Sequence, residues 1–457
     1  MDLEQTKTIC IIGAGAAGLA ALKAILDAPQ YKAGLWKPVA FEARDQIGGV
    51  WLPDSAPSDS VLPQTPLYDS LTTNLPHPVM CFPSFPFPPS TPVFPAAVHV
   101  QRYLESYAAH FNLGPFIRLK TLVSDVRRES SKWTIRLNSG EIMTADLVIV
   151  ANGHHTIPRY PNVPGIDAWL SAKKASHSVW YRRPKFLGDR VLVVGGGPSG
   201  TDISGEMRGA CTTLIRSISG AVRDDSSEHF KIRGRTTRFG ENGQVFFEDG
   251  SVETVDYCIL ATGYQVSFAF FSEPLLRASL PPPCPPLPDT LYNSTWHIFP
   301  LARHIFPLQA VFPPTSLVFI GLPVRVAPLP IMEAQAAAIL YAFAHPASLD
   351  VVAESRAVLA RYAALDGNPR AWSVFQEDEQ FDYRDELYAF AGEDVRVPRW
   401  LRDMYKAKAL LRSFWVELER RGEADDWVRG VGEGGPEEWV NLLHRLLAAA
   451  EEWESGK

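Results

Sequence analysis

The sequence predicts an α/β fold with two similar parallel-sheet domains and a helical C-terminal region. Two stretches far apart in the chain share one pattern: a short run of β-branched residues, a glycine-rich turn, and the start of a helix. They are residues 8–18 (TICIIGAGAAG) and 190–200 (RVLVVGGGPSG). Their separation is far too long for a solenoid repeat, so each is assigned to a domain of its own. With 457 residues the chain also exceeds one ordinary hydrophobic core.

The composition is that of a globular protein without a general affinity for polyanions. Hydrophobic residues make up 46% and charged residues 21%, and the formal net charge is −7. A negative net charge keeps a protein soluble and disfavours nonspecific binding to nucleic acid and anionic membranes. We therefore expect neither as a partner, whereas a charged cofactor can still be held by local positive groups.

The cysteines and the N-terminal residues indicate a cytoplasmic protein. The five cysteines are scattered, with no CxxC or CxxxxC pair: Cys10, Cys81, Cys211, Cys258 and Cys284. Such usage is typical of buried thiols in a reducing compartment and excludes a disulfide framework. A strand expected from about Thr8 leaves no room for a secretory signal. No run approaches the roughly 20 apolar residues that span a bilayer.

The first glycine motif, GAGAAG at residues 13–18, is typical of a dinucleotide-binding (Rossmann-like) turn. It follows a strand expected at Ile9–Ile12 and opens an alanine-rich helix expected at Ala16–Ala28. A pyrophosphate needs the backbone N–H groups of a helix N-terminus, and side chains there would block its approach. The first two glycines allow the turn and the contact, and the third lets the helix pack closely on the strand.

An acidic residue and a further pair of glycines assign FAD to this first turn. The strand at Val39–Phe41 ends in Glu42, whose carboxylate can accept both ribose hydroxyls. Glu42 lies further along than the usual spacing of about 20 residues, and Pro29–Pro38 is expected as a turn that takes up the extra length. Gly48-Gly49-Val50-Trp51 follows. In flavin enzymes of this fold such a pair lets the backbone approach the ribityl and phosphate part of the cofactor.

The second glycine motif, GGGPSG at residues 195–200, predicts NADPH. Its glycines occupy the GxGxxG positions after a strand at Val191–Val194. The next strand, Thr212–Ile215, ends in Arg216 and Ser217 and not in an acid. A carboxylate there would repel a 2′-phosphate, whereas a guanidinium can pair with it. The alternative for Arg216 is a solvated surface arginine.

Two further strand ends resemble each other: VIVANG at residues 148–153 and CILATG at residues 258–263. In flavoproteins with two nucleotide sites, such runs end each domain, where small residues let the chain pass close to the cofactor. We therefore expect Thr262 and Gly263 at the second cofactor.

The segment 48–95 is rich in proline, and residues 83–95 (PSFPFPPSTPVFP) can form neither regular helix nor central strand. Such a segment is expected to wrap over a surface and to cover a site. The other elements expected are helices at Val98–Phe111 and Met332–Ala344, strands at Ile117–Val126, Trp133–Leu137, Leu147–Ala151 and Ser316–Gly321, a hairpin at Val245–Val255, and a final helix after residues 432–438.

The sequence motifs of this chain together resemble those of a known family. The chain is similar to class B flavin-dependent monooxygenases, of the flavin-containing (dimethylaniline-type) branch, and especially to its fungal thiol-specific members. The stretches that carry the resemblance are GAGAAG, GGVW, TNLPHPVMCFPSFPFP (residues 73–88), HSVWY (residues 177–181), GGGPSGTDIS, CILATGY and IGLPVRVAPLPIMEAQ (residues 320–335). The stretches at 73–88 and 177–181 are the more discriminating ones.

The chain departs from one fingerprint of this family, FxGxxxHxxx(F/Y). With His177 as its histidine, the phenylalanine and glycine positions hold Ser171 and Lys173. Trp169 can substitute for the phenylalanine with a shifted spacing. The departure leaves the fold and cofactors as predicted, and it leaves the substrate branch open.

The resemblance implies a mechanism in which NADPH reduces the flavin, oxygen adds to give a C4a-(hydro)peroxyflavin, and one oxygen atom passes to a soft nitrogen or sulfur nucleophile. The cofactor performs this chemistry while the protein positions it and excludes water. Asn74 would hydrogen-bond at the flavin edge, although it could instead cap a loop. Gln335 and Ala327–Ile331 would approach the isoalloxazine. His177 and Ser178 would order the entry to the NADPH domain, with a core or surface histidine as the alternative for His177.

The resemblance also implies an NADPH-binding domain, residues 169–264, inserted into an FAD-binding domain made of residues 1–168 and 265–457. The catalytic cleft is expected between them, under the proline-rich segments. Asn74 is the expected catalytic residue, and no metal is expected. The expected cofactor-binding residues are Gly13, Gly15, Ala16, Ala17, Gly18, Glu42, Gly49, Val50, Trp51, Asn74, Gly195, Gly197, Pro198, Ser199, Gly200, Arg216, Ser217, Thr262, Gly263 and Gln335.

We therefore predict an NADPH- and O₂-dependent flavin monooxygenase that oxygenates an amine, thiol or thioether of a small molecule. A Baeyer–Villiger or N-hydroxylating monooxygenase of the same fold is an alternative. A disulfide reductase is disfavoured because it needs paired cysteines near the flavin. A flavin-binding interaction protein without turnover is disfavoured because both glycine motifs and Arg216 are present. The oligomeric state is open, with a homodimer as one option.

Overall fold

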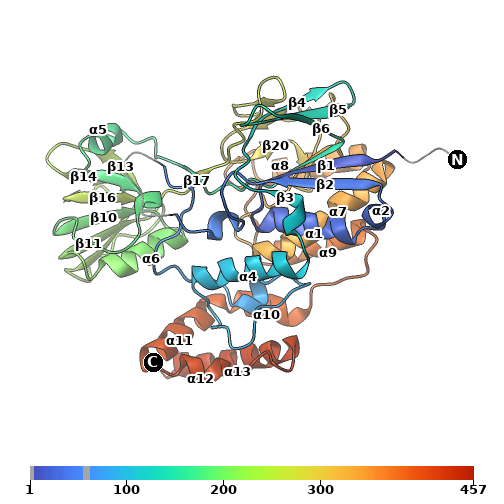
Figure 1. The fold of residues 1–457 in the computed structure, drawn as a ribbon. Coiled ribbons are helices and arrows are strands. Elements are labelled where there is room, and N and C mark those ends of the chain that lie inside the picture. Colours follow the sequence, from blue (N-terminus) through green and yellow to red (C-terminus); the bar gives the residue numbers. More distant parts are fainter. Residues whose placement is uncertain (1–4, 55–61, 457) are drawn as a thin grey trace. The chain divides into compact units, whose positions relative to one another are not determined.

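The computed structural model describes residues 5–54 and 62–456, and its contacts divide the chain into two compact units (Figure 1). Unit 1 consists of Met1–Leu52, Thr72–Gly153 and Val266–Lys457. Unit 2 consists of Pro53–Leu71 and His154–Gln265. Each unit contains one of the two glycine motifs.

Unit 1 is built on a five-stranded parallel sheet in the order β23-β7-β1-β2-β3. The strands are β1 (Lys7–Ile12), β2 (Trp36–Phe41), β3 (Ile117–Arg118), β7 (Leu147–Val150) and β23 (Leu317–Phe319). Every residue of the predicted strand Ile9–Ile12 is buried. Strands buried on both faces are typical of a parallel sheet between two layers.

Alternate residues of β1 serve two different hydrophobic cores. Ile9 and Ile11 pack with helices α1 (Ala16–Asp27) and α7 (Pro328–Ala344). Cys10 and Ile12 face the opposite core, which contains residues of a three-stranded antiparallel sheet. This sheet consists of β4 (Val123–Glu129), β5 (Lys132–Leu137) and β6 (Ile142–Ala145). The period of two along a strand thus places helices on one face and a second sheet on the other.

The stretch Pro29–Pro38, predicted as a turn, is more regular than expected. It contains the short helix α2 (Pro29–Lys32) and the first residues of β2. Proline at N1 suits a helix start. Pro38 opposes Ile9 within β2, whereas β3 pairs only with Ala40 and Phe41 on the other side. Pro38 therefore lies where that side of β2 is an edge, a position that tolerates proline.

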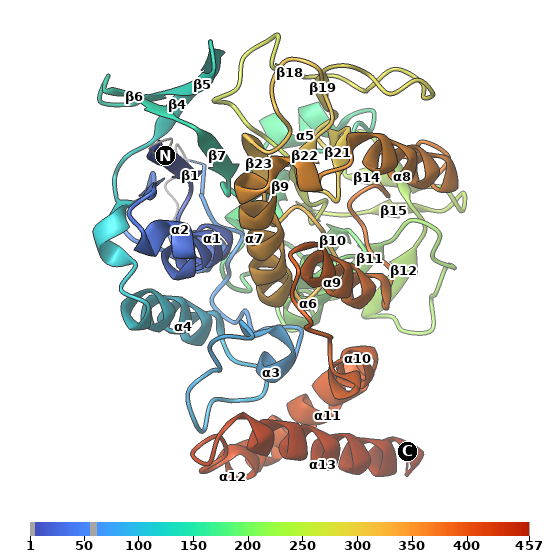
Figure 2. The same cartoon turned by 90° about the vertical axis from the view of Figure 1, so that its right-hand side faces the viewer.

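The C-terminal region of unit 1 is helical, as predicted (Figure 2). Its helices are α8 (Val351–Ala364), α9 (Glu379–Phe390), α10 (Arg399–Lys406), α11 (Lys408–Arg421), α12 (Ala424–Val428) and α13 (Pro436–Ser455). Unit 1 also contains α3 (His77–Met80), α4 (Ala97–His110), the 3₁₀ turns η1 (Gly49–Trp51), η2 (Gly114–Phe116) and η4 (Pro346–Ser348), and the short strands β18 (Leu276–Arg277), β19 (Leu291–Asn293), β20 (Ile298–Phe299), β21 (Leu301–Ala302) and β22 (Phe306–Pro307).

Unit 2 repeats the plan of unit 1 with a sheet in the order β12-β11-β10-β16-β9, again all parallel. Its strands are β9 (Ala175–His177), β10 (Arg190–Val194), β11 (Thr213–Ser217), β12 (Phe230–Arg233) and β16 (Tyr257–Leu260), with an antiparallel sheet of β13 (Thr236–Phe239), β14 (Gln244–Phe247) and β15 (Val252–Thr254). Its remaining elements are α5 (Ile166–Ser171), α6 (Pro198–Met207), η3 (Ser178–Trp180), β8 (Ile157–Pro158) and β17 (Tyr264–Gln265).

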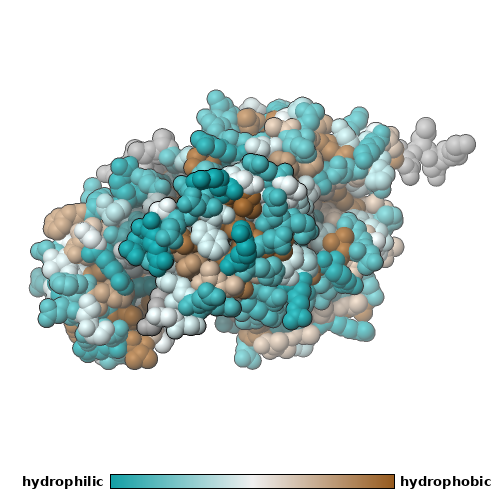
Figure 3. Space-filling view, turned by 90° about the horizontal axis from the view of Figure 1, so that it is seen from below, coloured by the Kyte–Doolittle hydropathy of each residue, from teal (hydrophilic) through white to brown (hydrophobic). Residues whose placement is uncertain are grey.

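The two faces of β10 are divided as those of β1 are. Val191 and Val193 pack with Ile203 and Met207 of α6, whereas Leu192 packs with residues of the antiparallel sheet β13-β14-β15. The order strand, helix, strand, antiparallel sheet, strand therefore occurs twice in one chain. Figure 3 shows hydrophilic residues over most of the face that it presents, with hydrophobic ones interspersed.

Candidate nucleotide and catalytic sites

The first glycine turn connects the end of β1 to the start of α1. Gly13 has φ +104°, in the region that favours glycine. A Cβ atom at Gly13 would lie 2.6 Å from the carbonyl oxygen of Ala151, which follows β7. A Cβ atom at Gly18 would lie 2.0 Å from the carbonyl oxygen of Gly13. Both glycines are therefore required by the close contact of β1, α1 and β7.

The same turn leaves room for a ligand at the start of α1. Gly15 is the N-cap of the helix, and no side chain of the described residues caps it. Ala16 and Ala17 supply the next N–H groups, which have no acceptor within the helix. Bare N–H groups and a positive dipole end form an anion site. This cradle, without side chains, fits a cofactor pyrophosphate.

Glu42 lies at the end of β2 beside this turn and is buried. One carboxylate oxygen accepts the N–H of Ala14 at 2.8 Å, and the other accepts the N–H of Arg44 at 2.9 Å. These bonds hold the carboxylate at the strand end, where a ribose would approach. Each oxygen keeps a further lone pair for a ribose hydroxyl.

The Gly48-Gly49 pair lies directly against the glycine turn. The N–H of Gly48 donates to the carbonyl of Ala14 at 3.1 Å. A Cβ atom at Gly49 would lie 2.9 Å from the Cα of Gly15. Val50 and Trp51 complete the 3₁₀ turn η1 and are half-buried. The two backbones therefore meet where the predicted flavin phosphates would lie.

Two side chains that sequence reasoning missed hold this second turn. Arg44 donates through Nη1 to the carbonyls of Gly49 (3.2 Å) and Leu52 (2.9 Å). Gln101 of α4 donates through Nε2 to the carbonyl of Ile47 at 2.9 Å. Arg44 follows Glu42 by two residues, and that position is the signal that could have found it. Gln101 has no such signal, because its contact depends on the tertiary fold.

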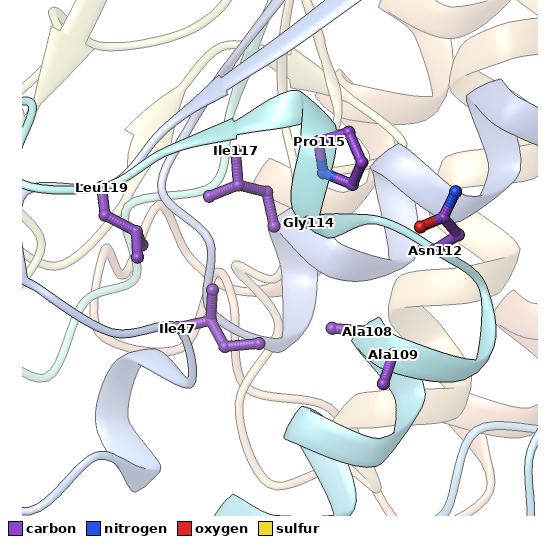
Figure 4. A pocket seen from close by; sticks show the side chains of 8 residues that line it. All are labelled: Ile47, Ala108, Ala109, Asn112, Gly114, Pro115, Ile117 and Leu119. Atoms are coloured by element: carbon purple, nitrogen blue, oxygen red, sulfur yellow. The ribbon is translucent and has the colours of Figure 1, made fainter.

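An apolar pocket of about 250 Å³ opens beside Ile47 in unit 1 (Figure 4). Its lining comes from Ile47 before η1 and from the segment that runs from the end of α4 through η2 and β3: Ala108, Ala109, Asn112, Gly114, Pro115, Ile117 and Leu119. The side chains of Ile47, Ile117 and Leu119 are apolar, so the pocket offers little to fix a phosphate.

The second glycine turn in unit 2 has the same construction as the first. Gly195 has φ +144°, and a Cβ atom there would lie 2.2 Å from the carbonyl oxygen of Ala261, which follows β16. A Cβ atom at Gly200 would lie 2.3 Å from the carbonyl oxygen of Gly195. Gly197 is the N-cap of α6, with Pro198 at N1 and Ser199 after it. This turn also fits a pyrophosphate.

Arg216 lies on β11 next to this turn. Its Nη2 donates to the hydroxyl of Thr201 at 2.7 Å, and its Nε donates to the carbonyl of Gly195 at 3.4 Å. Burial and, to a smaller extent, the neighbouring Arg208 lower the pKa of Arg216, which nevertheless stays protonated as arginines do. Arg208 stacks on Phe230 with its guanidinium carbon 3.8 Å from the ring centroid. Arg208 caps the C-terminal end of α6, so of these two arginines Arg216 is the one that contacts the glycine turn.

Ser217, the neighbour of Arg216, has an internal role. Its hydroxyl donates to the carbonyl of Gly234 at 2.8 Å and accepts the N–H of Thr236 at 3.1 Å. The residue is buried. These bonds join β11 to β13, so its side chain braces the strand that carries Arg216.

The end of β16 is fixed to the segment before α5. The hydroxyl of Thr262 donates to the carbonyl of Arg159 at 2.5 Å, and the carbonyl of Gly263 accepts the N–H of Arg159 at 2.9 Å. Gly263 has φ +79°. The bonds place the two predicted residues at the carboxyl end of the sheet, where ligands bind in such folds.

His177 uses both ring nitrogens inside unit 2. Nδ1 accepts the N–H of Val179 at 3.1 Å, and Nε2 lies 3.0 Å from the carbonyl of Gly263. An acceptor at Nδ1 requires the proton at Nε2, so the imidazole is neutral with one tautomer. Burial lowers the pKa of His177 to about 4. The ring therefore joins η3 to the end of β16, which agrees with an ordering role.

The altered fingerprint forms a tight turn after α5. Lys173 stands where the family pattern has glycine, and it has φ +55°. Its N–H donates to the carbonyl of Leu170, and the N–H of Lys174 donates to the carbonyl of Trp169. These bonds form the turn that ends α5. Trp169 is buried, and its indole N–H donates to the carbonyl of Gly240 at 2.9 Å.

Asn74 and Gln335 differ in how their amides are used. Asn74 is exposed, and its amide makes no hydrogen bond within residues 5–54 and 62–456, so it does not cap the loop. Gln335 is fully buried. Its carbonyl accepts the N–H of Gly321 at 2.8 Å, and its NH₂ donates to the hydroxyl of Tyr383 at 2.8 Å. Gln335 thus orders the turn after β23, and Asn74 keeps its amide free.

The cysteines lie in the described part of the chain, and all five are free thiols. Burial raises the pKa of the thiols of Cys10 on β1 and Cys258 on β16. Neither can serve as a thiolate relay.

Among the described residues no group of three or more acidic, histidine or cysteine side chains is placed to hold a metal. No described helix is long and apolar enough to cross a membrane.

Comparisons with known proteins agree with this geometry. A family model described as flavin-binding monooxygenase-like matches residues 6–223. The thiol-specific monooxygenase of Saccharomyces cerevisiae is 30% identical over 78% of this chain and 82% of its own length. Flavin-containing monooxygenase FMO GS-OX-like 2 of Arabidopsis thaliana is 29% identical over 94% of this chain and 96% of its own.

A solved structure extends the likeness to the whole chain. The S-allyl-L-cysteine S-oxygenase from Allium sativum covers 99% of this chain and 99% of its own, with a TM-score of 0.76 and 27% identity. The predicted two-domain α/β fold is thereby confirmed, as is the prediction of a flavin-dependent monooxygenase with FAD and NADPH as cofactors. The chain belongs to the flavin-binding monooxygenase-like family.

Proposed function

We propose that this chain is an NADPH- and O₂-dependent monooxygenase that adds one oxygen atom to a soft sulfur or nitrogen atom of a small molecule. In the net reaction NADPH, a proton and O₂ are consumed, and NADP⁺, water and the S- or N-oxygenated product are formed. The thiol-specific relative and the S-oxygenase with a similar structure favour sulfur.

The observation that carries the proposal is the pair of glycine turns with opposite residues at the following strand end. FAD is assigned to the turn at residues 13–18, where Glu42 can accept the ribose hydroxyls. NADPH is assigned to the turn at residues 195–200, where Arg216 can pair with a 2′-phosphate. A carboxylate and a guanidinium select different ligands from otherwise similar cradles.

The flavin, when bound and reduced by NADPH, supplies the activation of O₂. The protein binds and orients the cofactors and excludes water. We assign Asn74 as the residue that contacts the reacting edge of the flavin, since its exposed amide offers two N–H donors and one acceptor. An amide does not titrate at physiological pH, so Asn74 would orient groups by hydrogen bonds and would transfer no proton.

A panel of substrates tests the proposal. The purified yellow protein is incubated with NADPH, O₂ and, separately, a thiol, a thioether, a tertiary amine and a ketone, and the products are identified by mass spectrometry. We expect a product one oxygen atom heavier from the sulfur compounds or the amine. Oxygenation of the ketone alone would assign the chain to the Baeyer–Villiger alternative. NADPH oxidation without any oxygenated product from a broad set of amines and sulfur compounds would contradict the proposal.

A further inference from the structure

The loop that carries Asn74 has little regular structure of its own. It runs from Thr72 to Ala96 and contains only the one-turn helix α3. Its two ends meet, because Thr72 and Ala96 form a β-bridge and the N–H of Thr73 donates to the carbonyl of Pro95 at 2.9 Å. We call residues 72–96 the Asn74 loop. A loop so rich in proline cannot be fixed by a ladder of backbone hydrogen bonds.

The C-terminal helices α10 to α13 lie along this loop (Figures 1 and 2). The hydroxyl of Ser90 accepts the N–H of Gly430 at 3.0 Å, and the N–H of Ser90 donates to the carbonyl of Val431 at 2.9 Å. The ring of His77 lies edge-on to Trp439 of α13, with centroids 4.3 Å apart. Burial lowers the pKa of His77 to about 3, so a neutral ring packs there.

One contact lies close to Asn74 itself. Arg412 of α11 donates through Nη2 to the hydroxyl of Thr72 at 2.6 Å, two residues before Asn74. The guanidinium carbon also lies 5.2 Å from the ring centroid of Phe94 at the other end of the loop. Arg412 therefore touches both ends of the loop at the point where they meet. A charge-assisted hydrogen bond is about twice as strong as a neutral one.

We infer that Arg412 is a positioning residue for Asn74, and that the C-terminal helices fix the loop for catalysis. This inference rests on the role proposed above for Asn74. A reacting group must be held to within a fraction of an ångström for efficient chemistry, and contacts outside the site provide this precision. Arg412 supplies it through the hydroxyl of Thr72.

Paired variants of the whole protein test this role. Arg412→Ala and Thr72→Val each remove one partner of the hydrogen bond, whereas Arg412→Lys and Thr72→Ser each keep a donor or an acceptor. Arg420→Ala is the matched control, because Arg420 lies on the same helix, pairs with Glu417 and is mostly exposed. The double variant Arg412→Ala/Thr72→Val completes a thermodynamic cycle.

The first measurement is amide hydrogen exchange of peptides from the Asn74 loop, which needs no turnover. We expect exchange about tenfold faster in Arg412→Ala and in Thr72→Val, because each variant loses the charge-assisted hydrogen bond. The exchange rate of the double variant should equal that of the single variants. The rates of Arg412→Lys, Thr72→Ser and Arg420→Ala should stay close to that of the parent protein. The second measurement is the fraction of NADPH used for product and not for hydrogen peroxide, which should fall severalfold in the same two variants.

Two results would overturn the inference. One is exchange in the Asn74 loop that is the same in Arg412→Ala as in the parent. The other is faster exchange throughout unit 1, because that would mean a general loss of stability. If the parent protein itself forms no oxygenated product, the proposed function fails, whereas the exchange measurement still decides whether Arg412 holds the loop.

Discussion

The two glycine turns have nearly the same backbone and differ in the residue at the next strand end. In each turn the first glycine lies against the carbonyl of the residue that follows a neighbouring parallel strand, β7 in unit 1 and β16 in unit 2, and the third lies against the carbonyl of the first. Glu42 directly follows β2 in unit 1, whereas Arg216 is the penultimate residue of β11 in unit 2. The shared backbone binds a pyrophosphate, and the strand end distinguishes the nucleotides. One architecture thus acquires two ligands through side chains near the carboxyl end of the second strand, at positions that are not equivalent: Phe41 and Ser217 correspond, so Arg216 lies one residue before that pair and Glu42 one residue after it.

The largest effect is expected when a side chain replaces the hydrogen of the third glycine in either turn. Gly18→Ala places a Cβ atom 2.0 Å from the Gly13 carbonyl, and Gly200→Ala places one 2.3 Å from the Gly195 carbonyl. Such overlap forces the turn open. Gly18→Ala should yield protein with little bound flavin. Gly200→Ala should keep its flavin and lose NADPH binding. Flavin content by absorbance and NADPH affinity by titration check this, and loss of flavin in both variants would contradict separate sites.

Removing the guanidinium at the second strand end should have the next largest effect. Arg216→Ala should raise KM for NADPH by about 10- to 100-fold, the loss expected for a charged pair with phosphate. KM for NADH should hardly change, because NADH has no 2′-phosphate. Steady-state kinetics with both cofactors check this. Arg235→Ala is the control, because Arg235 is an exposed arginine of unit 2 paired with Glu248. An equal loss for both cofactors would show that Arg216 has only a structural role.

A change at Glu42, after the second strand of unit 1, should weaken the binding of FAD. Glu42→Gln keeps the shape of the side chain and replaces a charged acceptor by a neutral amide. We expect FAD to dissociate about tenfold more readily, since the amide has one acceptor oxygen where Glu42 uses two, for the N–H groups of Ala14 and Arg44. KM for NADPH should remain that of the parent. The fluorescence of flavin released on dilution measures the dissociation of FAD. An unchanged flavin affinity would show that Glu42 is not part of the FAD site.

The smallest effect is expected from His177, at the end of the edge strand β9 of the parallel sheet in unit 2. The pKa of His177 is about 4 in the folded protein, below the ordinary value of about 6.5 in an unfolded chain. The unfolded state therefore binds the proton first as the pH falls. Between about pH 6.5 and 4, His177 should cost the folded state roughly 1.4 kcal/mol per pH unit.

A neutral replacement isolates this contribution from those of the other buried histidines. His177→Gln should be less stable than the parent at pH 7, because it loses ring contacts and one or both hydrogen bonds. Between pH 6.5 and 5, its free energy of unfolding should fall less steeply with pH than that of the parent. The difference between the two slopes should correspond to about one bound proton. Chemical unfolding at several pH values measures both slopes. Parallel slopes would mean that His177 is already protonated or exposed.

The sequence predicts well what depends on local chemistry. The strand, turn and helix around Gly13 and Gly195 follow from spacing and residue type, and they are found as predicted. The turn at Pro29–Pro38 was predicted less well, because the tolerance of a strand edge for Pro38 depends on where β3 ends. Lys173 shows another limit, since a non-glycine residue stands at the glycine position of the family pattern and has a positive φ.

Contacts between distant residues lie beyond such reasoning. Gln101 and Arg412 are ordinary polar residues of helices in the sequence, and their partners are found only once the chain is folded. Gln335 was predicted near the isoalloxazine, and its amide is instead engaged by Gly321 and Tyr383, an arrangement that no spacing reveals. Whether the turn it orders lies at the flavin stays a prediction.

Anaerobic reduction of the purified protein tests most directly whether the two turns hold two different nucleotides. The protein is mixed in the absence of oxygen with NADPH or with NADH, and the visible absorbance of its flavin is followed. We predict bound FAD that NADPH bleaches rapidly and NADH bleaches far more slowly. A colourless protein, or bound FAD that neither nucleotide reduces, would contradict the account.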